Sequence, residues 1–462
     1  MLSIGALSSA AQGASYYERD GYYAKDDPEH RHASAWAGKG ADELGLKGPV
    51  DPDTFRAVLE GRVPDGSDTR LGRRGKDGSI EHRPGRDLTF SSPKSVSIAA
   101  LVGGDRRIVE AHDRAVAATL AWVEKNAAET RMKNPGSGEL VPAPEPGGQV
   151  PETGRMGRVG GQKIVAATFT HDTSRNLDPQ LHTHAVLANM VKGEDGKWRS
   201  MANESLYANQ KLIGMLYRNE LAAGLGKLGY GIEKTHADGR FEIGGVPRAA
   251  VAAFSSRRTE IEAAMAERGL GASADNPRIA ERAALMTRAA KRDIDREELR
   301  VVWQRQAADL GLDTGALVAN AIERSGPAER EVAPEPASGV DRTPEPVAPG
   351  LPDIGDAGRT GTAAMGAPSR EPADAGNGAN VPERDVAADS APASPAAEAV
   401  AWAMAHFSER EAVFSRTDLF AAALAHAPGA VAIGEVEREV AALEKAGTLH
   451  AVDLPGAEAS LT

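Results

Sequence analysis

The chain has 462 residues, which allows one large domain and smaller pieces, and its apolar content of 41% is ordinary for a globular protein. It contains no cysteine, which excludes disulfides, thiolate metal sites and cysteine nucleophiles, so histidine, carboxylate or water must hold any metal. The net charge of −12 is concentrated in residues 327–397, which carry 12 Asp and Glu against 5 Arg and no Lys, so the rest of the chain is only mildly acidic.

At the N-terminus, MLSIGALSSAAQGAS lacks the pattern of a secretory signal and predicts a first strand. No run approaches the ~18 apolar residues of a membrane span, so we expect a cytoplasmic protein without membrane insertion. RDLTFSSPKSVS predicts a strand, a turn and a helix that begins near Pro93, with Ser91 or Ser92 as its N-cap. Apolar residues then recur at helical spacing over residues 105–132.

The middle of the chain mixes strand and helix patterns. KIVAATFTH and LHTHAVLANM predict two strands, and GEDGKW supplies a turn to another short strand. Residues 206–228 are helical in pattern, RFEIGG is strand-like, and residues 248–310 predict a succession of charged helices. Because these elements do not alternate as βαβ units, we predict an α+β fold, with an antiparallel central sheet flanked by helices.

Three regions are predicted along the chain. Residues 1–315 form the large domain. Residues 316–395 form a disordered linker, because they are rich in Pro, Ala, Gly and acidic residues and contain no aromatic residue. Residues 396–462 form a small module with three helices and a strand, which suits a winged-helix-like unit; a packing module without DNA contact is the alternative.

Three histidines form the first candidate site. His182 and His184 are two apart in a β-like run, so both lie on one face of the strand. His171 ends the preceding run, and the ten residues DTSRNLDPQL between the runs can fold it back beside the other two. Three neutral imidazoles that converge on one point make an open metal site with positions left for a substrate oxygen.

Four of the seven tyrosines form the second candidate site, as two adjacent pairs: Tyr16, Tyr17, Tyr22 and Tyr23. A phenol has a pKa of about 10 and is a poor nucleophile unless its proton has an acceptor. Asp87, which opens a strand, is the carboxylate that we expect to assist. A basic cluster precedes it, and from this cluster and the Ser-Pro-Lys helix start we select Arg74, Arg83 and Lys94 as candidate DNA phosphate contacts.

These motifs resemble a known family. The YY-x4-YY tyrosines, GRDLTFSSPKS, WAGKGADELGLKG and especially THDTSRNLDPQLHTHAVLAN are similar to the relaxase domain of MobF-class conjugative relaxase-helicases of F-like plasmids. These proteins belong to the histidine-hydrophobe-histidine endonuclease superfamily, and here Thr183 stands at the centre of the motif. The resemblance covers about the first 310 residues and returns at EAVAWAMAHFSEREAVFSRTDL, which is similar to the start of the helicase portion.

The resemblance implies a palm-like relaxase fold and a site-specific DNA nickase and strand transferase. Tyr16 would attack the scissile phosphate at an origin of transfer to give a 5′-phosphotyrosyl link, and Tyr22 would perform the second transfer, with Tyr17 and Tyr23 as alternatives. His171, His182 and His184 would bind a divalent metal (Mg, Mn or Zn), and Asp87 would assist the tyrosine proton or orient a ligand. Single-stranded and hairpin DNA, relaxosome accessory proteins and a type IV secretion coupling protein would be the partners, and the protein could be translocated to a recipient cell with the DNA.

Other readings remain open. The chain has no G-x-x-x-x-G-K-[ST] motif, so we predict no ATPase or helicase motor and a chain that is truncated where the family's helicase would begin. A rolling-circle replication initiator would share the chemistry. A three-histidine hydrolase would use water as its nucleophile, and a DNA-binding remnant would have no activity.

Overall fold

The computed structural model describes residues 1–11, 13–14, 34–133, 156–267, 296–326, 394–409, 413–452 and 460–461. The chain divides into two compact units, one formed by Met1–Ala333 with Ala393–Thr462 and the other by Pro334–Pro392. The second unit lies outside the described residues. No helix in the described ranges has both the length and the apolar content that a membrane crossing requires.

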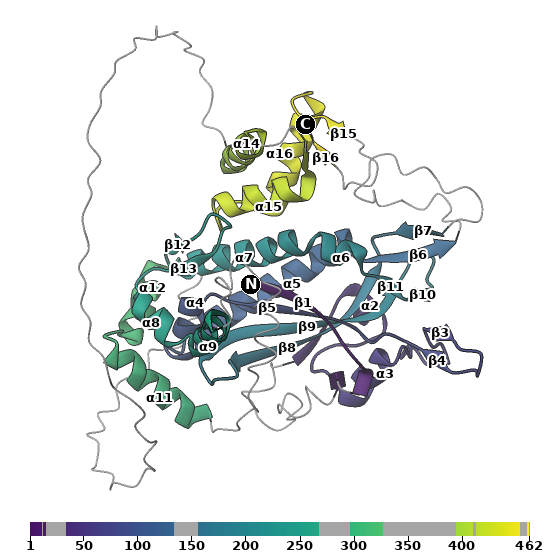
Figure 1. Cartoon of the computed structure of the whole chain (residues 1–462), viewed down its shortest axis with the longest axis horizontal. Helices are drawn as coiled ribbons and strands as arrows, with labels where there is room; N and C mark the ends of the chain where they lie inside the picture. The colour runs from purple at the N-terminus through teal and green to yellow at the C-terminus, as the bar shows by residue number, and fades with distance from the viewer. Residues whose placement is uncertain are drawn as a thin grey trace. The chain divides into compact units, whose positions relative to one another are not determined.

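A six-stranded antiparallel sheet forms the centre of the first unit (Figure 1). The strand order is β1-β5-β9-β8-β2, and β10 pairs with β9. The bounds are β1 Leu2–Ala6, β2 Ser34–Ala37, β5 Gly85–Ser91, β8 Lys163–Thr173, β9 Pro179–Lys192 and β10 Trp198–Arg199. Every pairing in this sheet is antiparallel, which confirms the predicted α+β arrangement and the strands expected at the N-terminus and in the two histidine-containing runs.

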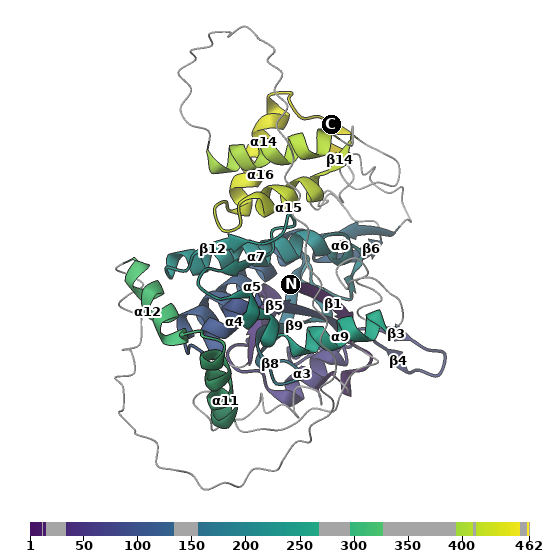
Figure 2. The same ribbon diagram turned by 60° about the vertical axis from the view of Figure 1, so that its left-hand side comes forward.

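Three helices cover one face of the sheet: α4 Lys94–Leu101, α5 Arg106–Asn126 and α7 Gln210–Lys227. Successive side chains of a strand point to opposite faces, so Leu88 and Phe90 of β5 lie on this face. Both are fully buried in the main core beneath Ile108 and Val116 of α5 and Tyr217 of α7. The helices α5 and α7 run side by side above the sheet in both ribbon views (Figures 1 and 2).

The opposite face of the sheet is covered by α2 Lys39–Glu43 and α3 Pro52–Leu59. Asp51 caps α3, since its carboxylate accepts from the Thr54 backbone N–H at 2.9 Å. The Phe55 ring of α3 packs edge-on against Phe169 of β8, with ring centroids 5.3 Å apart. The odd-numbered residues of β8 therefore lie on the α3 face.

The predicted start of a helix near Pro93 is confirmed, but its predicted serine cap and the predicted end of the next helix were wrong. Helix α4 begins at Lys94 with Pro93 as its N-cap, and no serine side chain caps it. The Ser92 hydroxyl instead bonds the Ser97 hydroxyl at 2.9 Å and the Leu181 carbonyl at 3.1 Å, so it joins the helix to β9. Helix α5 ends at Asn126, and residues 129–132 belong to a strand, because this segment pairs with β7 and β11.

Shorter elements surround the central sheet. The strands β6 Glu129–Lys133, β7 Met156–Val159 and β11 Met201–Ala202 form one small sheet, β3 Arg73–Arg74 and β4 Ile80–Glu81 form a ribbon, and β12 Ile232–Lys234 and β13 Phe241–Ile243 form another. The predicted helix over residues 206–228 is divided into α6 Glu204–Ala208 and α7. The charged helices are α8 Arg248–Ala253, α9 Ser256–Ala266 and α11 Arg296–Asp309.

The predicted linker begins later than residue 316, because α12 Thr314–Arg324 occupies its first residues. The Asp313 carboxylate accepts from the Ala316 N–H at 2.8 Å, and Leu317 and Ala321 are buried against the main core. A capped helix with a buried apolar face is ordered despite its position beside an acidic, proline-rich segment. Residues 327–393 lie outside the described residues, so the remainder of the linker stays a prediction.

The C-terminal module consists of α14 Pro395–Ser408, α15 Arg416–His426 and α16 Ile433–Lys445, with the short strands β14 Phe414–Ser415, β15 Ala451–Val452 and β16 Ser460–Leu461 in the order β14-β16-β15. Its apolar core includes Leu212, Met215 and Leu216 of α7. The buried Asn219 amide donates to the Val431 carbonyl at 2.7 Å and accepts from the Gly429 N–H at 2.8 Å. The module thus packs on α7, and its winged-helix character stays a prediction.

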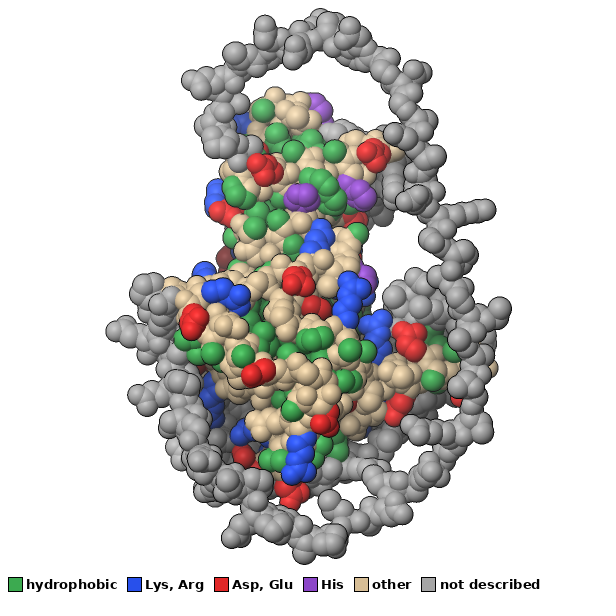
Figure 3. Space-filling model, turned by 90° about the vertical axis from the view of Figure 1, so that its left-hand side faces the viewer, with side chains coloured by type: hydrophobic (Ala, Val, Ile, Leu, Met, Phe, Trp, Pro, Cys, Tyr) green, Lys and Arg blue, Asp and Glu red, His purple; other side chains and the backbone are tan. Residues whose placement is uncertain are grey.

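Aromatic stacking marks the surface of this module. The Trp402 ring stacks with His406 at 5.3 Å and with His426 at 4.6 Å between centroids. Histidine side chains are visible on the C-terminal helices in Figure 3, where acidic and basic side chains are interspersed over the face drawn. Burial and the nearby Lys234 lower the pKa of His426, so we expect a neutral ring in this stack at neutral pH.

Candidate metal centre

Strand register brings three histidines together on the α3 face of the sheet. His171 of β8 is the direct register partner of His182 of β9, and His184 lies two residues further along the same face. The ring centroids of His171 are 4.7 Å from those of both His182 and His184, which are 5.3 Å from each other. One ring nitrogen from each lies within 4.8 Å of the others. The predicted convergence of the three imidazoles is therefore present.

The connection between His171 and His182 is shorter than the broad connection that the sequence predicted. Strand β8 continues to Thr173 and β9 begins at Pro179, so only a tight turn separates the strands. The pairing shifts by one residue between His171 and Thr173, a β-bulge of the kind that re-aims a neighbouring side chain. His171 meets the other two through regular strand pairing, since extended pairing places opposite residues side by side.

On two of the histidines, a hydrogen bond to Nδ1 determines which ring nitrogen carries the proton. The His184 Nδ1 lies 2.7 Å from the Asp87 Oδ2, and a carboxylate requires that this nitrogen carry the proton. The His182 Nδ1 lies 2.9 Å from the Gln180 carbonyl oxygen, which requires the same tautomer. In the neutral tautomer that these contacts require, Nδ1 of each ring carries the proton and Nε2 does not, which is the form of imidazole that binds a metal through Nε2.

Asp87 is placed as the sequence suggested, beside the histidines. It lies on β5, whose Thr89 is the register partner of His184. The Thr89 hydroxyl is 3.2 Å from the His184 Nδ1 and 3.4 Å from the Asp87 Oδ1. The Asp87 side chain is 20% exposed and that of His184 is 13% exposed, so this contact is sheltered from solvent. Asp87 thus contacts a candidate ligand histidine, and its role, to assist the tyrosine proton or to orient a ligand, stays a prediction.

A buried polar network behind the site escaped the sequence analysis. On the opposite face of β9, the Thr183 hydroxyl is 2.8 Å from the His112 Nε2, and the His112 Nδ1 is 2.7 Å from the Tyr217 hydroxyl. Burial and the nearby His182 lower the pKa of His112 to about 3, so His112 is neutral and serves as both donor and acceptor. The sequence did contain a signal for this network, because His112 follows Ala111 on the apolar side of the helical pattern that became α5.

The candidate phosphate contacts lie in different settings. Arg74, on β3, and Arg83, between β4 and β5, are exposed. The Lys94 ammonium donates to the Pro179 carbonyl at 2.8 Å, and burial lowers its pKa to about 8, although Asp178 and Glu242 oppose this shift. The first turn of α4 is occupied by the Glu242 carboxylate, which accepts from the Ser95 N–H at 2.8 Å. The phosphate-binding role of all three cations stays a prediction.

Tyr16, Tyr17, Tyr22 and Tyr23 lie outside the described residues. Ala14, the last described residue before them, is fully buried in one cluster with Phe55 and Phe169. Phe169 is the register partner of His184. Ala14 therefore lies on the face of the sheet that carries the histidines.

The histidines fit a divalent metal by their chemistry. Three imidazole nitrogens at the edge of a protein core form the protein part of an open site, and a carboxylate on the other nitrogen of a ligand is the usual outer partner. Zinc, manganese and nickel all accept histidine, so the ligand set alone does not select one ion. An antiparallel sheet that displays such a set beside an aspartate is the arrangement that the resemblance to histidine-hydrophobe-histidine relaxases implies.

Comparison with known proteins agrees with this class. The sequence model of the TrwC relaxase family matches residues 10–145 and 147–310, and the chain belongs to this family. The multifunctional conjugation protein TraI of Escherichia coli (strain K12) is 39% identical over 348 residues, which are 73% of this chain and 18% of TraI. The chain thus spans about a fifth of the length of that relative.

Two solved structures extend the likeness to three dimensions. The conjugative relaxase TrwC in its metal-bound complex with OriT DNA is 38% identical, with a TM-score of 0.57. TrwC complexed with a 27-mer DNA that comprises the recognition hairpin and the cleavage site is also 38% identical, with a TM-score of 0.56. Each match covers 68% of this chain and 100% of the TrwC chain, so the relaxase fold accounts for the larger part of the molecule.

Proposed function

We propose that this protein nicks and rejoins one DNA strand at a plasmid origin of transfer during conjugation. The observation that carries the proposal is the cluster of His171, His182 and His184, with Asp87 on His184, in a chain of the TrwC relaxase family. The relatives support the substrate, since TraI is described as a conjugation protein and TrwC was solved with OriT DNA. The family match, which ends at residue 310, supports a relaxase domain of residues 1–315, and we propose that a linker and the C-terminal module follow it.

The proposed reaction is a transesterification. The Tyr16 phenol oxygen attacks the scissile phosphorus, the bond from phosphorus to the 3′ oxygen breaks, and that oxygen leaves as a 3′-hydroxyl after it gains a proton. The DNA 5′ end is then held as a phosphotyrosine, and attack by a 3′-hydroxyl reverses the step. Tyr22 serves the second transfer, with Tyr17 and Tyr23 as the alternatives within each pair. The position of Ala14 on the histidine face supports a nucleophile from the first pair.

His171, His182 and His184 would hold the divalent metal (Mg, Mn or Zn). When bound there, the metal offsets the negative charge of the scissile phosphate. Asp87 holds the proton of the His184 Nδ1 and thereby keeps the His184 Nε2 directed at the site. The Gln180 carbonyl does the same for His182.

The proposed substrate is single-stranded DNA next to a hairpin, in the cytoplasm, with transfer to a recipient cell as a further step. Arg74, Arg83 and Lys94 are the proposed phosphate contacts. Backbone binding of this kind releases counterions, so affinity falls as salt rises. Relaxosome accessory proteins and a type IV secretion coupling protein are proposed as partners, and no ATPase motor is proposed.

A denaturing gel tests the reaction. The protein is incubated with labelled single-stranded oligonucleotides that tile the transfer origin of its own plasmid, with a divalent metal or with a chelator. We expect a protein–DNA band that needs metal and falls at least about 100-fold in the Tyr16→Phe protein, because phenylalanine has no nucleophilic oxygen. Tyr207→Phe is the matched control, since Tyr207 is exposed on α6, and it should leave the band unchanged.

The other outcomes separate the alternatives. Cleavage without a covalent band indicates a hydrolase that uses water. A covalent band that persists in Tyr16→Phe and disappears in Tyr17→Phe moves the nucleophile by one residue. A protein that binds the DNA but neither links nor cuts it is a DNA-binding remnant. Covalent activity directed at a replication origin, with none at the transfer origin, indicates a rolling-circle initiator.

Asp87→Asn is expected to weaken divalent metal binding about tenfold, because removal of an outer partner of a ligand histidine typically costs 10–100-fold in affinity. The asparagine amide can still accept a hydrogen bond but carries no charge. Isothermal titration with Mn²⁺ measures the change. Asp195→Asn is the control, since Asp195 pairs with Arg199 in the turn after β9. Equal affinities for the wild type and Asp87→Asn would show that this contact does not support the metal.

A further inference from the structure

The turn of residues 174–178 joins the two strands that carry the histidines. The Ser174 hydroxyl stabilises this turn, because the hydroxyl accepts hydrogen bonds from the Asn176 and Asp178 N–H groups at 3.2 and 3.1 Å. The Ser174 N–H donates to the Asp178 carbonyl at 2.9 Å. Leu177 adopts φ 64°, a left-handed conformation that is costly for a branched side chain. Such a conformation persists only where the surroundings hold it.

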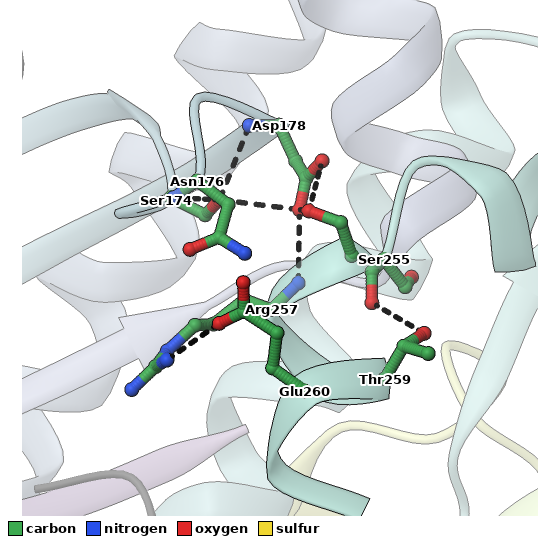
Figure 4. Close-up of polar contacts among 8 residues, drawn as sticks. Ser174, Asn176, Asp178, Ser255, Arg257, Thr259 and Glu260 are labelled. Carbon is green, nitrogen blue, oxygen red and sulfur yellow. Dashed lines mark hydrogen bonds and ion pairs between the residues drawn. The ribbon is translucent and has the colours of Figure 1, made fainter. Parts of the chain in front are cut away.

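Asp178 ties this turn to a helix that is distant in sequence. Its carboxylate, on a residue that is only 9% exposed, accepts from the Ser256 hydroxyl at 2.8 and 2.9 Å and faces the Arg257 N–H at 3.4 Å. Ser256 and Arg257 open helix α9, whose own N-cap, Ser255, makes no side-chain cap. Figure 4 shows Asp178 between the turn and the start of α9. Asp178 thus caps α9 from another segment of the chain.

Two further elements hold the residues on either side of Asp178. The Trp303 indole N–H, from α11, donates to the Leu177 carbonyl at 2.8 Å, and Trp303 is only 5% exposed. The Lys94 ammonium, from α4, donates to the Pro179 carbonyl at 2.8 Å. The last two residues of the turn and the first residue of β9 are therefore each held by a different helix. Such fixation is unusual for a hairpin loop, because loops are normally more mobile than the strands they connect.

We infer that Asp178 and Ser256 are positioning residues for the three-histidine centre. This inference rests on the proposed function, since it concerns the metal-binding geometry. Pro179 is the first residue of β9, three residues before His182, and the β-bulge after His171 leaves that histidine next to the same turn. A shift of the turn would therefore change the pairing of His171 with His182, and a small displacement of a ligand weakens a metal site.

The test compares Ser256→Ala with Ser255→Ala in the full-length protein. Ser255 is the matched control, because its hydroxyl donates to the Val251 carbonyl of α8 and none of its described hydrogen bonds reaches the turn. Binding of Mn²⁺ is measured by isothermal titration, and Co²⁺ is used as a spectroscopic probe of ligand geometry. We expect Ser256→Ala to bind Mn²⁺ about tenfold more weakly and to change the Co²⁺ visible spectrum, with Ser255→Ala unchanged within about twofold. Asp178→Asn should behave as Ser256→Ala does.

Hydrogen exchange of the metal-free proteins is the second measurement. Backbone amides of residues 180–184 should exchange faster in Ser256→Ala than in Ser255→Ala, because the start of β9 is less firmly held. Wild-type affinity, spectrum and exchange in both Ser256→Ala and Asp178→Asn would overturn the inference and leave the metal site intact. A wild-type protein that binds no more metal than His182→Ala would overturn the proposed metal site, and with it this inference.

Discussion

The His182→Ala protein is expected to lose at least 100-fold in divalent metal affinity and to form no detectable covalent DNA adduct. His182 offers its Nε2 to the site, and an alanine at this position presents no donor atom to the metal. A loss of 100-fold corresponds to about 2.7 kcal/mol of binding free energy. The histidine is partly exposed and its Nδ1 contacts the Gln180 backbone carbonyl, so the protein should remain folded.

Mn²⁺ titration and the denaturing gel measure these two losses, and circular dichroism reports folding. His236→Ala is the matched control, because His236 is exposed in the hairpin between β12 and β13 and its described ring contact is with its neighbour Thr235. Adduct formation by His182→Ala at the wild-type rate, in the presence of chelator, would rule out a role for this histidine cluster in the reaction.

The Asp105→Ala protein is expected to lose about 3–5 kcal/mol of unfolding free energy, because removal of one partner leaves a buried charge uncompensated. Asp105 and Arg107 have side chains that are 1% and 3% exposed, and two hydrogen bonds of 2.9 and 2.7 Å join them. The same carboxylate accepts from the Tyr230 hydroxyl at 2.8 Å and from the Arg107 N–H at the start of α5. Burial and the nearby Asp105 raise the pKa of Tyr230 well above its usual value, so the phenol stays protonated as a donor.

Urea unfolding followed by circular dichroism measures this loss. Glu110→Ala is the control on the same helix: Glu110 pairs with Arg114 at 3.7 Å, but both side chains are more than half exposed, so the expected change is below about 0.5 kcal/mol. An Asp105→Ala, Arg107→Met double variant should recover part of the loss, since no buried charge remains. A loss below about 1 kcal/mol in Asp105→Ala would show that water or a local rearrangement compensates the arginine.

The sequence alone determined the class of fold, the family and the three histidines that converge. Period-two alternation placed His182 and His184 on one face, because successive residues of a strand point in opposite directions. The motif around His171 was enough to identify the relaxase family, which the family match and the TrwC structures confirmed. These are local signals, and local geometry follows from the order of residue types along the chain.

Only the tertiary structure decided the register and the contacts between distant segments. The pairing of His171 with His182, the contact of Asp87 with His184 and the role of Asp178 at the start of α9 join residues up to 97 positions apart. The burial of His112 against Thr183 likewise depends on how α5 packs on the sheet. No pattern within one segment encodes such contacts, because they arise when two separately formed elements meet and exclude water between them.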